Sequence, residues 1–343
     1  LLEGTSRLLL MPDLFNYYLC GAQVSEYSIA STTQMLDSRT KMWSKEVLES
    51  LGIPERILGG IVPCGTRLGF IKNGICQELG IEPMEVIAVA GHDTQSALAA
   101  VPARDKDFIF ISCGTWSLFG TELDEPVING VSERLNITNE GGCQGKISFL
   151  KNIIGLWLIQ ESRRQWIREG KEYSFGHLEQ MAADAKPFKA LIDPDAPEFV
   201  PAGNIPERIR SYCRKSGQKI PENEAELVRC INESLALKYR MALEEIKMCT
   251  GREYPAIHMV GGGTQSELLC QMTANACHCP VIAGPVEVTV LGNASMQLLA
   301  TGELRDLAQV RSVVGASSKL NIYEPKDAAQ WEQVYGQYKK MLE

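Results

Sequence analysis

The chain has 343 residues, of which 45% are hydrophobic and 22% are charged, a composition typical of a globular protein with room for two domains. Its formal net charge of −8 at pH 7 argues against a nucleic-acid-binding surface, which needs a basic face. No apolar run approaches the roughly 18 residues that a membrane helix requires, and the opening residues lack the pattern of a secretory signal. We therefore expect a cytoplasmic protein that binds neither nucleic acid nor membranes.

Strands and helices are predicted to alternate along the chain, which indicates an α/β fold. Glycine and proline end several helices, and Asp13 is a candidate cap for the first. In chain order, the predicted elements are a strand or loop entering a helix at 8–15, helices at 42–51 and 75–79, a buried strand at 86–90, a helix at 95–101, a hairpin at 108–120, a polar glycine-rich loop at 137–143, helices at 151–170 and 224–249, a strand at 256–260, a helix at 265–276, a strand at 281–283 and a helix at 291–300.

Eleven cysteines are spaced irregularly, and we expect most of them to be buried, reduced thiols, since a free cysteine packs like a small hydrophobic residue. Cys277-His278-Cys279 is a tight cluster but supplies too few ligands for a zinc site. Cys213 and Cys230 flank a proline-containing turn and could meet, although a disulfide is unusual in a reducing compartment. The sequence therefore predicts no metal-binding residues.

The segment from Gly91 to Ser117 is the most informative part of the sequence. A strand breaks at Gly114-Thr115, and such a turn can offer backbone N–H groups and a hydroxyl to a phosphate. Asp93 follows a buried strand and could act as a general base toward an alcohol. Together these features indicate phosphoryl transfer from a nucleotide to a hydroxyl group. The chain lacks a P-loop sequence, so the nucleotide would be bound in another way.

A glycine triplet at 261–263 stands between a predicted strand and a predicted helix. Glycines there let a ligand approach the backbone closely, and the start of the helix favours anions or polar ligand edges. The triplet could also form an ordinary turn.

The other candidates have structural interpretations too. Asp93 could be the N-cap of a helix starting near Thr94, although His92 beside it, at the mouth of a buried strand, favours a ligand site. Thr115 could be a turn residue. Asn152 and Gln160 lie eight residues apart on the predicted 151–170 helix, where either could be a cap or a solvated amide.

Taken in order, these motifs resemble the FGGY carbohydrate kinases, members of the actin/hexokinase/Hsp70-like ATPase superfamily. The strings that carry the resemblance are Leu10-Met-Pro-Asp-Leu-Phe, Ser31-Thr-Thr-Gln, His92-Asp-Thr, Ser112-Cys-Gly-Thr-Trp-Ser-Leu, Asn136-Ile-Thr-Asn-Glu-Gly-Gly, Leu150-Lys-Asn-Ile-Ile-Gly-Leu-Trp-Leu-Ile-Gln, Val260-Gly-Gly-Gly, Val281-Ile-Ala-Gly-Pro-Val-Glu and Leu291-Gly-Asn. The Asn-Glu-Gly-Gly and Lys-Asn-Ile-x-Gly-Leu-Trp strings point to the members that phosphorylate L-rhamnulose at its 1-hydroxyl.

The resemblance implies an actin-like (ribonuclease H-like) fold, ATP and Mg²⁺ as cofactors, and a small sugar, L-rhamnulose, as the acceptor. It also implies a role for each matching residue. Asp93 matches the catalytic base, His92, Thr94 and Asn152 match sugar contacts, and Thr115, Gln160 and Gly262 match ATP contacts. Closure of two lobes would exclude water from the reaction.

The sequence departs from the family at its start. The acidic residue and phosphate turn Asp-x-Gly-[Ser/Thr/Ala], with which the first lobe of the family opens, are absent. We expect residues 1–88 to be the C-terminal remnant of the first, sugar-binding lobe, and residues 89–343 to be a nearly complete second, nucleotide-binding lobe. The chain alone should then be inactive or severely impaired, unless another chain supplies the absent segment. Rhamnulose-dependent turnover of roughly 1–100 per second would contradict this expectation.

Two alternatives stay open from the sequence. The acceptor could be fuculose, xylulose or a polyol, because one or two hydroxyl contacts decide sugar identity. The chain could also be a non-catalytic nucleotide-binding lobe, although a binding module has no use for the base Asp93.

Overall fold

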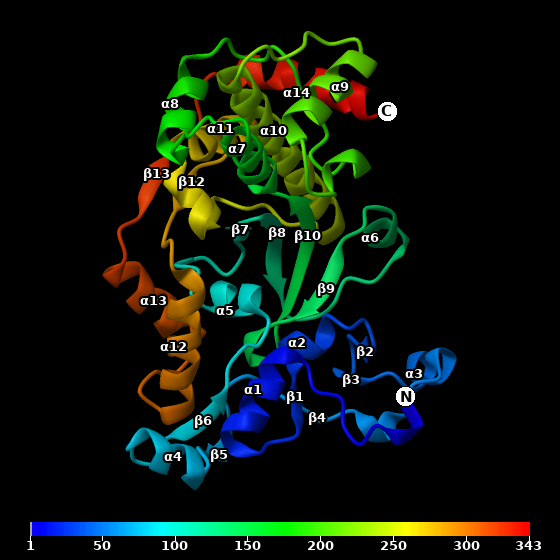
Figure 1. The fold of residues 1–343 in the computed structure, drawn as a ribbon, viewed down its shortest axis with the longest axis vertical. Coiled ribbons are helices and arrows are strands. Elements are labelled where there is room, and N and C mark those ends of the chain that lie inside the picture. The colour runs from blue at the N-terminus through cyan, green and yellow to red at the C-terminus, as the bar shows by residue number, and fades with distance from the viewer. Residues whose placement is uncertain (1) are drawn as a thin grey trace. The chain divides into compact units, whose positions relative to one another are not determined.

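The computed structural model describes residues 2–343, which form two compact units, each built from three stretches of chain (Figure 1). Unit 1 comprises residues 1–104, 121–150 and 287–317, and unit 2 comprises residues 105–120, 151–286 and 318–343. Unit 1 therefore contains residues from the beginning, middle and end of the sequence, whereas unit 2 begins at residue 105.

Unit 1 is made of short elements joined by turns. Its elements are η1 (Leu2–Gly4), α1 (Met11–Cys20), β1 (Val24–Glu26), α2 (Tyr27–Ser31), β2 (Leu36–Asp37), β3 (Met42–Trp43), α3 (Lys45–Leu51), η2 (Glu55–Ile57), β4 (Gly60–Val62), β5 (Thr66–Phe70), α4 (Asn73–Leu79), β6 (Glu85–Ala88), α5 (Asp93–Ala99), α6 (Gly130–Arg134), β9 (Thr138–Gly141), η3 (Cys143–Gly145), α12 (Val288–Thr301) and α13 (Leu307–Ser317). Three two-stranded sheets pair β1 with β4, β2 with β3 and β5 with β6.

Unit 2 holds the longest helices. Its elements are β7 (Ile109–Cys113), α7 (Trp157–Arg168), α8 (Phe175–Asp184), η4 (Pro197–Phe199), α9 (Ile205–Lys215), α10 (Glu224–Thr250), β11 (Ile257–Val260), η5 (Gly262–Gln265), α11 (Glu267–Cys277), β12 (Val281–Ala283), β13 (Asn321–Tyr323) and α14 (Ala328–Leu342). Two further strands, β8 (Trp116–Leu123) and β10 (Ile147–Ile154), contain residues of both units.

The large sheet has seven strands in the order β13-β12-β11-β7-β8-β10-β9. Strand β11 pairs in parallel with both β7 and β12, and β13 pairs antiparallel with β12. All four residues of β11 are buried, as expected for a parallel strand that is covered on both faces. The carboxyl end of β11 leads directly into the glycine triplet at 261–263.

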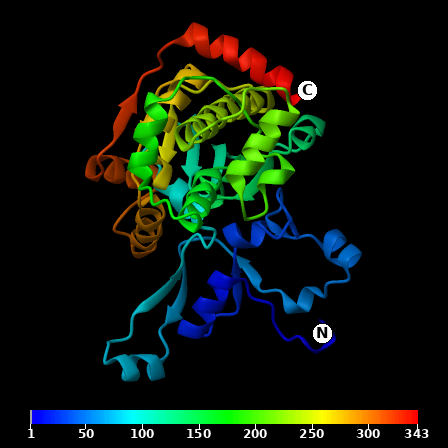
Figure 2. The ribbon, with the colours of Figure 1, turned by 45° about the horizontal axis from the view of Figure 1, so that its top comes forward.

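Helix α10 supplies many of the buried residues of the unit 2 core. The side chain of Asn223 accepts the backbone N–H of Glu226 at 3.0 Å and caps its start, and Gly251 ends it in the left-handed conformation with φ 65°, as helix C-termini favour. Figure 2 shows α14, in red, beside α10 and α11. Their shared core contains Leu191, Ala236, Leu237, Met272, Ala276, Trp331, Val334, Tyr335 and Tyr338.

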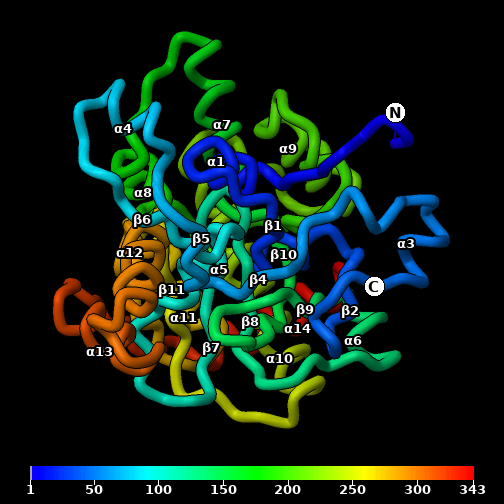
Figure 3. The backbone as a smooth tube through the Cα atoms, turned by 90° about the horizontal axis from the view of Figure 1, so that it is seen from below, coloured from blue at the N-terminus to red at the C-terminus, as the bar shows by residue number. Residues whose placement is uncertain are grey.

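Helix α5 of unit 1 packs closely along α12, as Figures 1 and 3 show. A Cβ atom placed on Gly292 of α12 would lie only 1.7 Å from the carbonyl oxygen of Ser96 in α5. Only glycine at position 292 allows this approach, which fixes the position of α5 within unit 1.

Several predicted elements differ from the structure. The helix predicted at 151–170 begins only at Trp157, because residues up to Ile154 belong to strand β10. The polar loop predicted at 137–143 contains strand β9, which pairs with β10. Asp13 lies within the first turn of α1 rather than at its N-cap, and its buried carboxylate accepts the N–H of Glu26 at 3.1 Å. The strand predicted at 86–90 pairs only with β5, outside the large sheet.

The cysteines are free thiols throughout. Cys213 and Cys230 do meet, as predicted, but they are hydrogen-bonded thiols rather than a disulfide. Within residues 2–343, no helix is both long and apolar enough to cross a bilayer.

Candidate functional site

Asp93 is the first residue of α5, and its side chain is 80% exposed. The N-cap position belongs to His92, whose side chain makes no capping hydrogen bond. One carboxylate oxygen of Asp93 accepts the N–H of Thr94 at 2.7 Å and lies 3.8 Å from Nε2 of His92. The structure thus brings these three residues together and leaves most of the Asp93 carboxylate open to an incoming group.

The turn before Asp93 is held by a buried carboxylate. Oε2 of Glu26 accepts the N–H of Gly91 at 2.9 Å, and Oγ of Ser28 accepts the N–H of His92 at 3.1 Å. The Ser28 hydroxyl in turn donates to Glu26 at 2.5 Å. Burial raises the pKa of Glu26 despite these hydrogen bonds, which lower it. Glu26 also caps α2, so one side chain fixes two backbone segments.

A second acidic residue, Glu140 of β9, lies beside the ring of His92. Nδ1 of His92 lies 3.2 Å from Oε2 of Glu140, and the side-chain amide of Gln95 donates to the same oxygen at 3.2 Å. Ser148 donates to Gln95 at 2.5 Å and completes the chain of contacts. Burial lowers the pKa of His92, but the Glu140 carboxylate, together with Asp93 and Glu26, outweighs burial and the pKa is raised.

Glu26 and Glu140 were not predicted as site residues. Each left a weak signal: Glu26 is the only charged residue between Asp13 and Asp37, and Glu140 lies in the Asn-Glu-Gly-Gly string. An isolated acid in a neutral segment indicates burial and pairing, but its partner cannot be read from the sequence.

In unit 2, the structure brings Thr115 and Gln160 together. Thr115 is exposed at the turn between β7 and β8, and its hydroxyl donates to Oε1 of Gln160 at 3.2 Å. The carbonyl oxygens of Gly114 and Thr115 accept the N–H groups of Leu156 at 2.9 Å and Trp157 at 3.1 Å. The hairpin turn is therefore tied to the first turn of α7.

A cavity of about 400 Å³ lies beside this turn, within unit 2. Gln160 and Gly262 line it, whereas Thr115 does not. Its walls are largely apolar, with polar groups at a few points, as is typical of small-molecule sites. The lining residues are Leu156, Ile159, Gln160, Phe175, Gly176, Leu178, Glu179, Val228, Asn232, Gly262, Gly263, Gln265 and Ser266.

The three glycines beside the cavity differ in what they allow. A Cβ atom on Gly263 would lie 2.1 Å from Sγ of Cys113, so this glycine is required for packing against β7. Gly261 has a φ of 85°, which favours glycine. A Cβ atom on Gly262 would meet nothing within 4 Å. Gly262 therefore leaves open space on the cavity side, where a ligand could approach the backbone.

The start of α11 is already filled by protein groups. The carboxylate of Glu179 accepts the N–H of Leu268 at 2.7 Å and the hydroxyl of Ser266 at 3.1 Å. Ser266 itself accepts the N–H of Leu269 at 3.1 Å. The start of α11 thus holds an anion, as expected, but that anion is the carboxylate of Glu179 rather than a ligand.

Asn152 lies on strand β10 in unit 2 and is exposed. The residues His92, Asp93 and Thr94 belong to unit 1. The assignment of Asn152 and Gln160 to one helix is wrong, because the strand ends at Ile154 and α7 begins at Trp157. Gly155 lies in the break between β10 and α7. A Cβ atom there would lie 2.5 Å from Oγ of Ser117, so the hairpin packs closely against the chain at this break.

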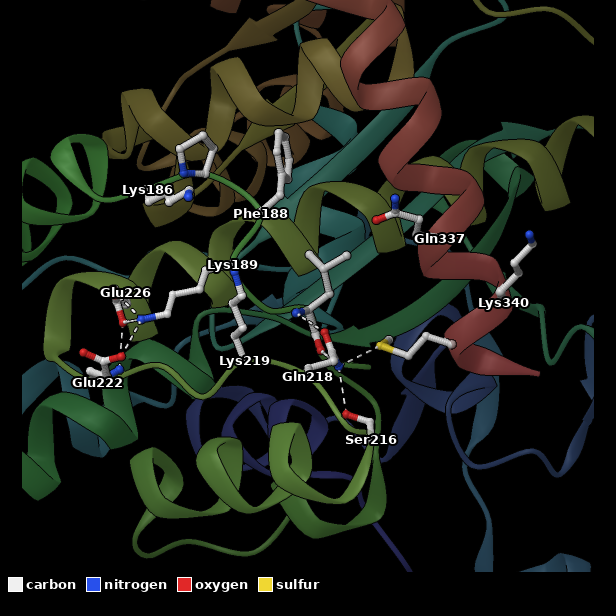
Figure 4. Close-up of a pocket in the computed structure, with 13 residues that line it drawn as sticks. Lys186, Phe188, Lys189, Ser216, Gln218, Lys219, Glu222, Glu226, Gln337 and Lys340 are labelled. Carbon is white, nitrogen blue, oxygen red and sulfur yellow. Dashed lines mark hydrogen bonds and ion pairs between the residues drawn. The ribbon is translucent and has the colours of Figure 1, made fainter.

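A second cavity in unit 2, of about 960 Å³, is shown in Figure 4. Lys189 pairs there with Glu222 and Glu226 at 3.1 and 2.7 Å. Gln218 bonds both backbone groups of Leu191, each at 2.8 Å. These central polar groups are therefore satisfied by the protein.

Comparison with known proteins agrees with the fold and the motifs. Residues 109–301 match the C-terminal domain of the FGGY family of carbohydrate kinases, and residues 2–100 match its N-terminal domain. The chain is 43% identical over 341 residues to a protein named rhamnulokinase from Bacteroides thetaiotaomicron, covering 99% of this chain and 70% of that protein. It is 40% identical over 325 residues to a rhamnulokinase from Enterococcus faecalis, covering 94% of this chain and 65% of that protein.

A solved structure supports the fold independently. A ligand-bound xylulose kinase from Lactobacillus acidophilus superposes with a TM-score of 0.75 and 18% sequence identity, covering 98% of this chain and 67% of that chain. The chain belongs to the FGGY family of carbohydrate kinases. The predicted α/β fold of the actin-like ATPase class is confirmed. The chain spans 65 to 70% of the length of the two curated relatives named above.

Proposed function

We propose that the chain is part of a kinase that transfers the γ-phosphoryl group of ATP to the 1-hydroxyl of L-rhamnulose. The similarity to two proteins named rhamnulokinase over nearly the whole chain supports this substrate. The observation that carries the chemistry is the geometry at Asp93: an open carboxylate on a turn fixed by Glu26 and Ser28. A fixed and accessible carboxylate is what a general base toward an alcohol requires.

Asp93 would accept the proton of the sugar hydroxyl as the phosphoryl group arrives. His92, Thr94 and Asn152 would contact the sugar. Nδ1 of His92 faces Glu140 at 3.2 Å, so the ring could present its other nitrogen to a sugar hydroxyl. We also propose that residues 1–88 are the end of the sugar-binding lobe and that residues 89–343 are the nucleotide-binding lobe.

Thr115, Gln160 and Gly262 would contact ATP. The Thr115–Gln160 hydrogen bond ties the hairpin turn to the wall of the 400 Å³ cavity, so a nucleotide with its base in the cavity could direct its phosphates toward the turn. Mg²⁺ stays a prediction. Within residues 2–343, no three His, Cys, Asp or Glu side chains gather to hold a metal ion, and we assign no step to one.

The decisive experiment replaces Asp93 with asparagine, both in this chain and in a version extended to the length of the curated relatives. In whichever version turns over L-rhamnulose, the rate should fall by about 10²- to 10⁴-fold, the usual contribution of a general base. ADP affinity, measured by calorimetry, should stay unchanged. Glu133→Gln, which removes an exposed charge of α6 in the same unit, is the matched control. Undiminished turnover by the Asp93 variant would overturn the assignment.

A further inference from the structure

Asn232 of α10 is a buried amide that the proposed function has not used. Its side chain lines the 400 Å³ cavity, and the residue is only 2% exposed. Its Oδ1 atom is buried and has no hydrogen-bond partner anywhere in residues 2–343. A buried polar atom without a partner destabilises a protein by about 1–3 kcal/mol, so its presence needs an explanation.

The other polar side chains around the cavity are already engaged or solvated. Glu179 and Ser266 bond the start of α11, Gln160 accepts from Thr115, and Gln265 is exposed. Among the side chains that line the cavity, Asn232 is therefore a buried polar residue whose acceptor oxygen has no hydrogen-bond donor. The residues around it supply flat, apolar contact area but no hydrogen-bonding alternative.

We infer that Asn232 reads the base of the bound nucleotide and selects a purine that carries an amino group at position 6. This inference rests on the proposed nucleotide site. A carboxamide offers one donor and one acceptor side by side, which matches the adjacent amino group and ring nitrogen N7 of adenine. Guanine and hypoxanthine place two acceptors, O6 and N7, at the same edge, so an amide cannot satisfy both.

The apolar part of the cavity fits the same ligand. Leu156, Ile159 and Val228 line the cavity with aliphatic side chains, and such surfaces accommodate the flat faces of a purine without discriminating between purines. The open space at Gly262 lets the ligand lie against the backbone. The aliphatic side chains would thus contact the faces of the base, and Asn232 would distinguish adenine from other purines by hydrogen bonds to its edge.

The test compares the dissociation constants of ADP and IDP for the wild-type chain and for Asn232→Leu, measured by calorimetry. We expect ADP binding to weaken by about 5- to 150-fold, the range for one bidentate base contact, while IDP binding changes little. The ADP preference over IDP should therefore collapse. The unfolding midpoint in urea should be equal or higher, because leucine removes an unsatisfied buried atom.

A structural role for Asn232 predicts the opposite pattern. Asn232→Leu would then lower the unfolding midpoint and weaken both nucleotides equally, which would overturn the inference. Asn232→Ala removes both the donor and the acceptor without adding a buried charge, so it should also lose the preference and provides a second variant. Gln265→Leu, an exposed position of the same cavity, is the matched control and should keep the preference.

Two failures are distinguishable. Absence of ADP binding by the wild-type chain would overturn the proposed nucleotide site together with this inference. Binding of ADP by the wild type with an unchanged ADP-to-IDP ratio in both Asn232 variants would overturn the inference alone.

Discussion

The start of α5 in unit 1 and the cavity in unit 2 differ in how their buried acceptors are satisfied. Around α5, the buried carboxylates accept hydrogen bonds: Glu26 accepts the N–H of Gly91, and Glu140 accepts the side-chain amide of Gln95. In the cavity, the buried acceptor of Asn232 has no partner among the described residues. In the proposed function, the first arrangement would fix the general base before any substrate arrives. The second would leave a binding group unsatisfied until a ligand completes it.

The largest expected effect concerns the packing that fixes α5. Gly292→Ala places a Cβ atom where 1.7 Å separates it from the carbonyl oxygen of Ser96, so α5 and α12 must move apart. Overpacking of this kind destabilises by about 1–3 kcal/mol, and urea unfolding would measure it. Gly315→Ala of α13, where the nearest atom is 3.5 Å away, should be neutral or stabilising. Equal midpoints for both variants would show that close packing does not hold α5.

Substitutions at two adjacent glycines test whether a ligand occupies the open space at Gly262. Gly262→Val should leave the unfolding midpoint unchanged, because its side chain enters open space, but should weaken ADP binding by tenfold or more, about 1.4 kcal/mol. Gly263→Ala should lower the midpoint, because its Cβ atom meets Sγ of Cys113 at 2.1 Å. Calorimetry and urea unfolding of both variants separate the two effects. Tight ADP binding by Gly262→Val would place the nucleotide elsewhere.

The charge of Glu140 beside His92 can be removed without changing the size of the side chain. Glu140→Gln should lower the pKa of His92, because the largest interaction that offsets burial is lost while those with Asp93 and Glu26 remain. NMR titration of the histidine ring protons would measure this, with His92→Gln used for assignment. In the wild type, the stabilisation from this pair is present below the ordinary histidine pKa and is lost as pH rises through the raised value. An unchanged pKa in the variant would exclude Glu140 as the cause.

A pH-dependent effect on stability is expected at Asp13. Burial, followed by the nearby Glu26 carboxylate, raises its pKa to about 7, although the hydrogen bond from the Glu26 N–H opposes this. Its contribution to stability is therefore present below pH 3.8 and is lost as pH rises toward 7. Asp13→Asn should gain stability relative to the wild type as pH rises from 5 to 8. Parallel urea-midpoint curves for the two proteins would contradict the raised pKa.

Local signals predicted several helices, but the helices α8, α9, α13 and α14 were not predicted. The long α10 was expected at 224–249 and runs from Glu224 to Thr250, because Asn223 and Gly251 are strong local caps. The strands β9 and β10 were missed, because their identity depends on pairing with each other and on packing at Gly155 rather than on local preference.

The same division applies to the candidate site. Three candidate site residues were selected from the sequence because they lie in motifs: Asp93, Thr115 and Gly262. Glu26 and Glu140 were not, because their roles come from partners 65 and 48 residues away along the chain, at Gly91 and His92. A buried acid can be suspected from its apolar surroundings, but only the fold shows what it holds.

The chain of contacts from Glu26 through His92 and Glu140 to Ser148 has a consequence for biosynthesis. Its members enter the growing polypeptide in the order in which they are numbered, and Gln95 is bonded by Ser148, 53 residues later. Long-range contacts of this kind form late in folding, because loop closure precedes any gain. While the chain is being made, the segment with Asp93 thus emerges well before its last anchors. A translation product that stops before β10 would carry the complete motif around Asp93 but not the arrangement that positions it.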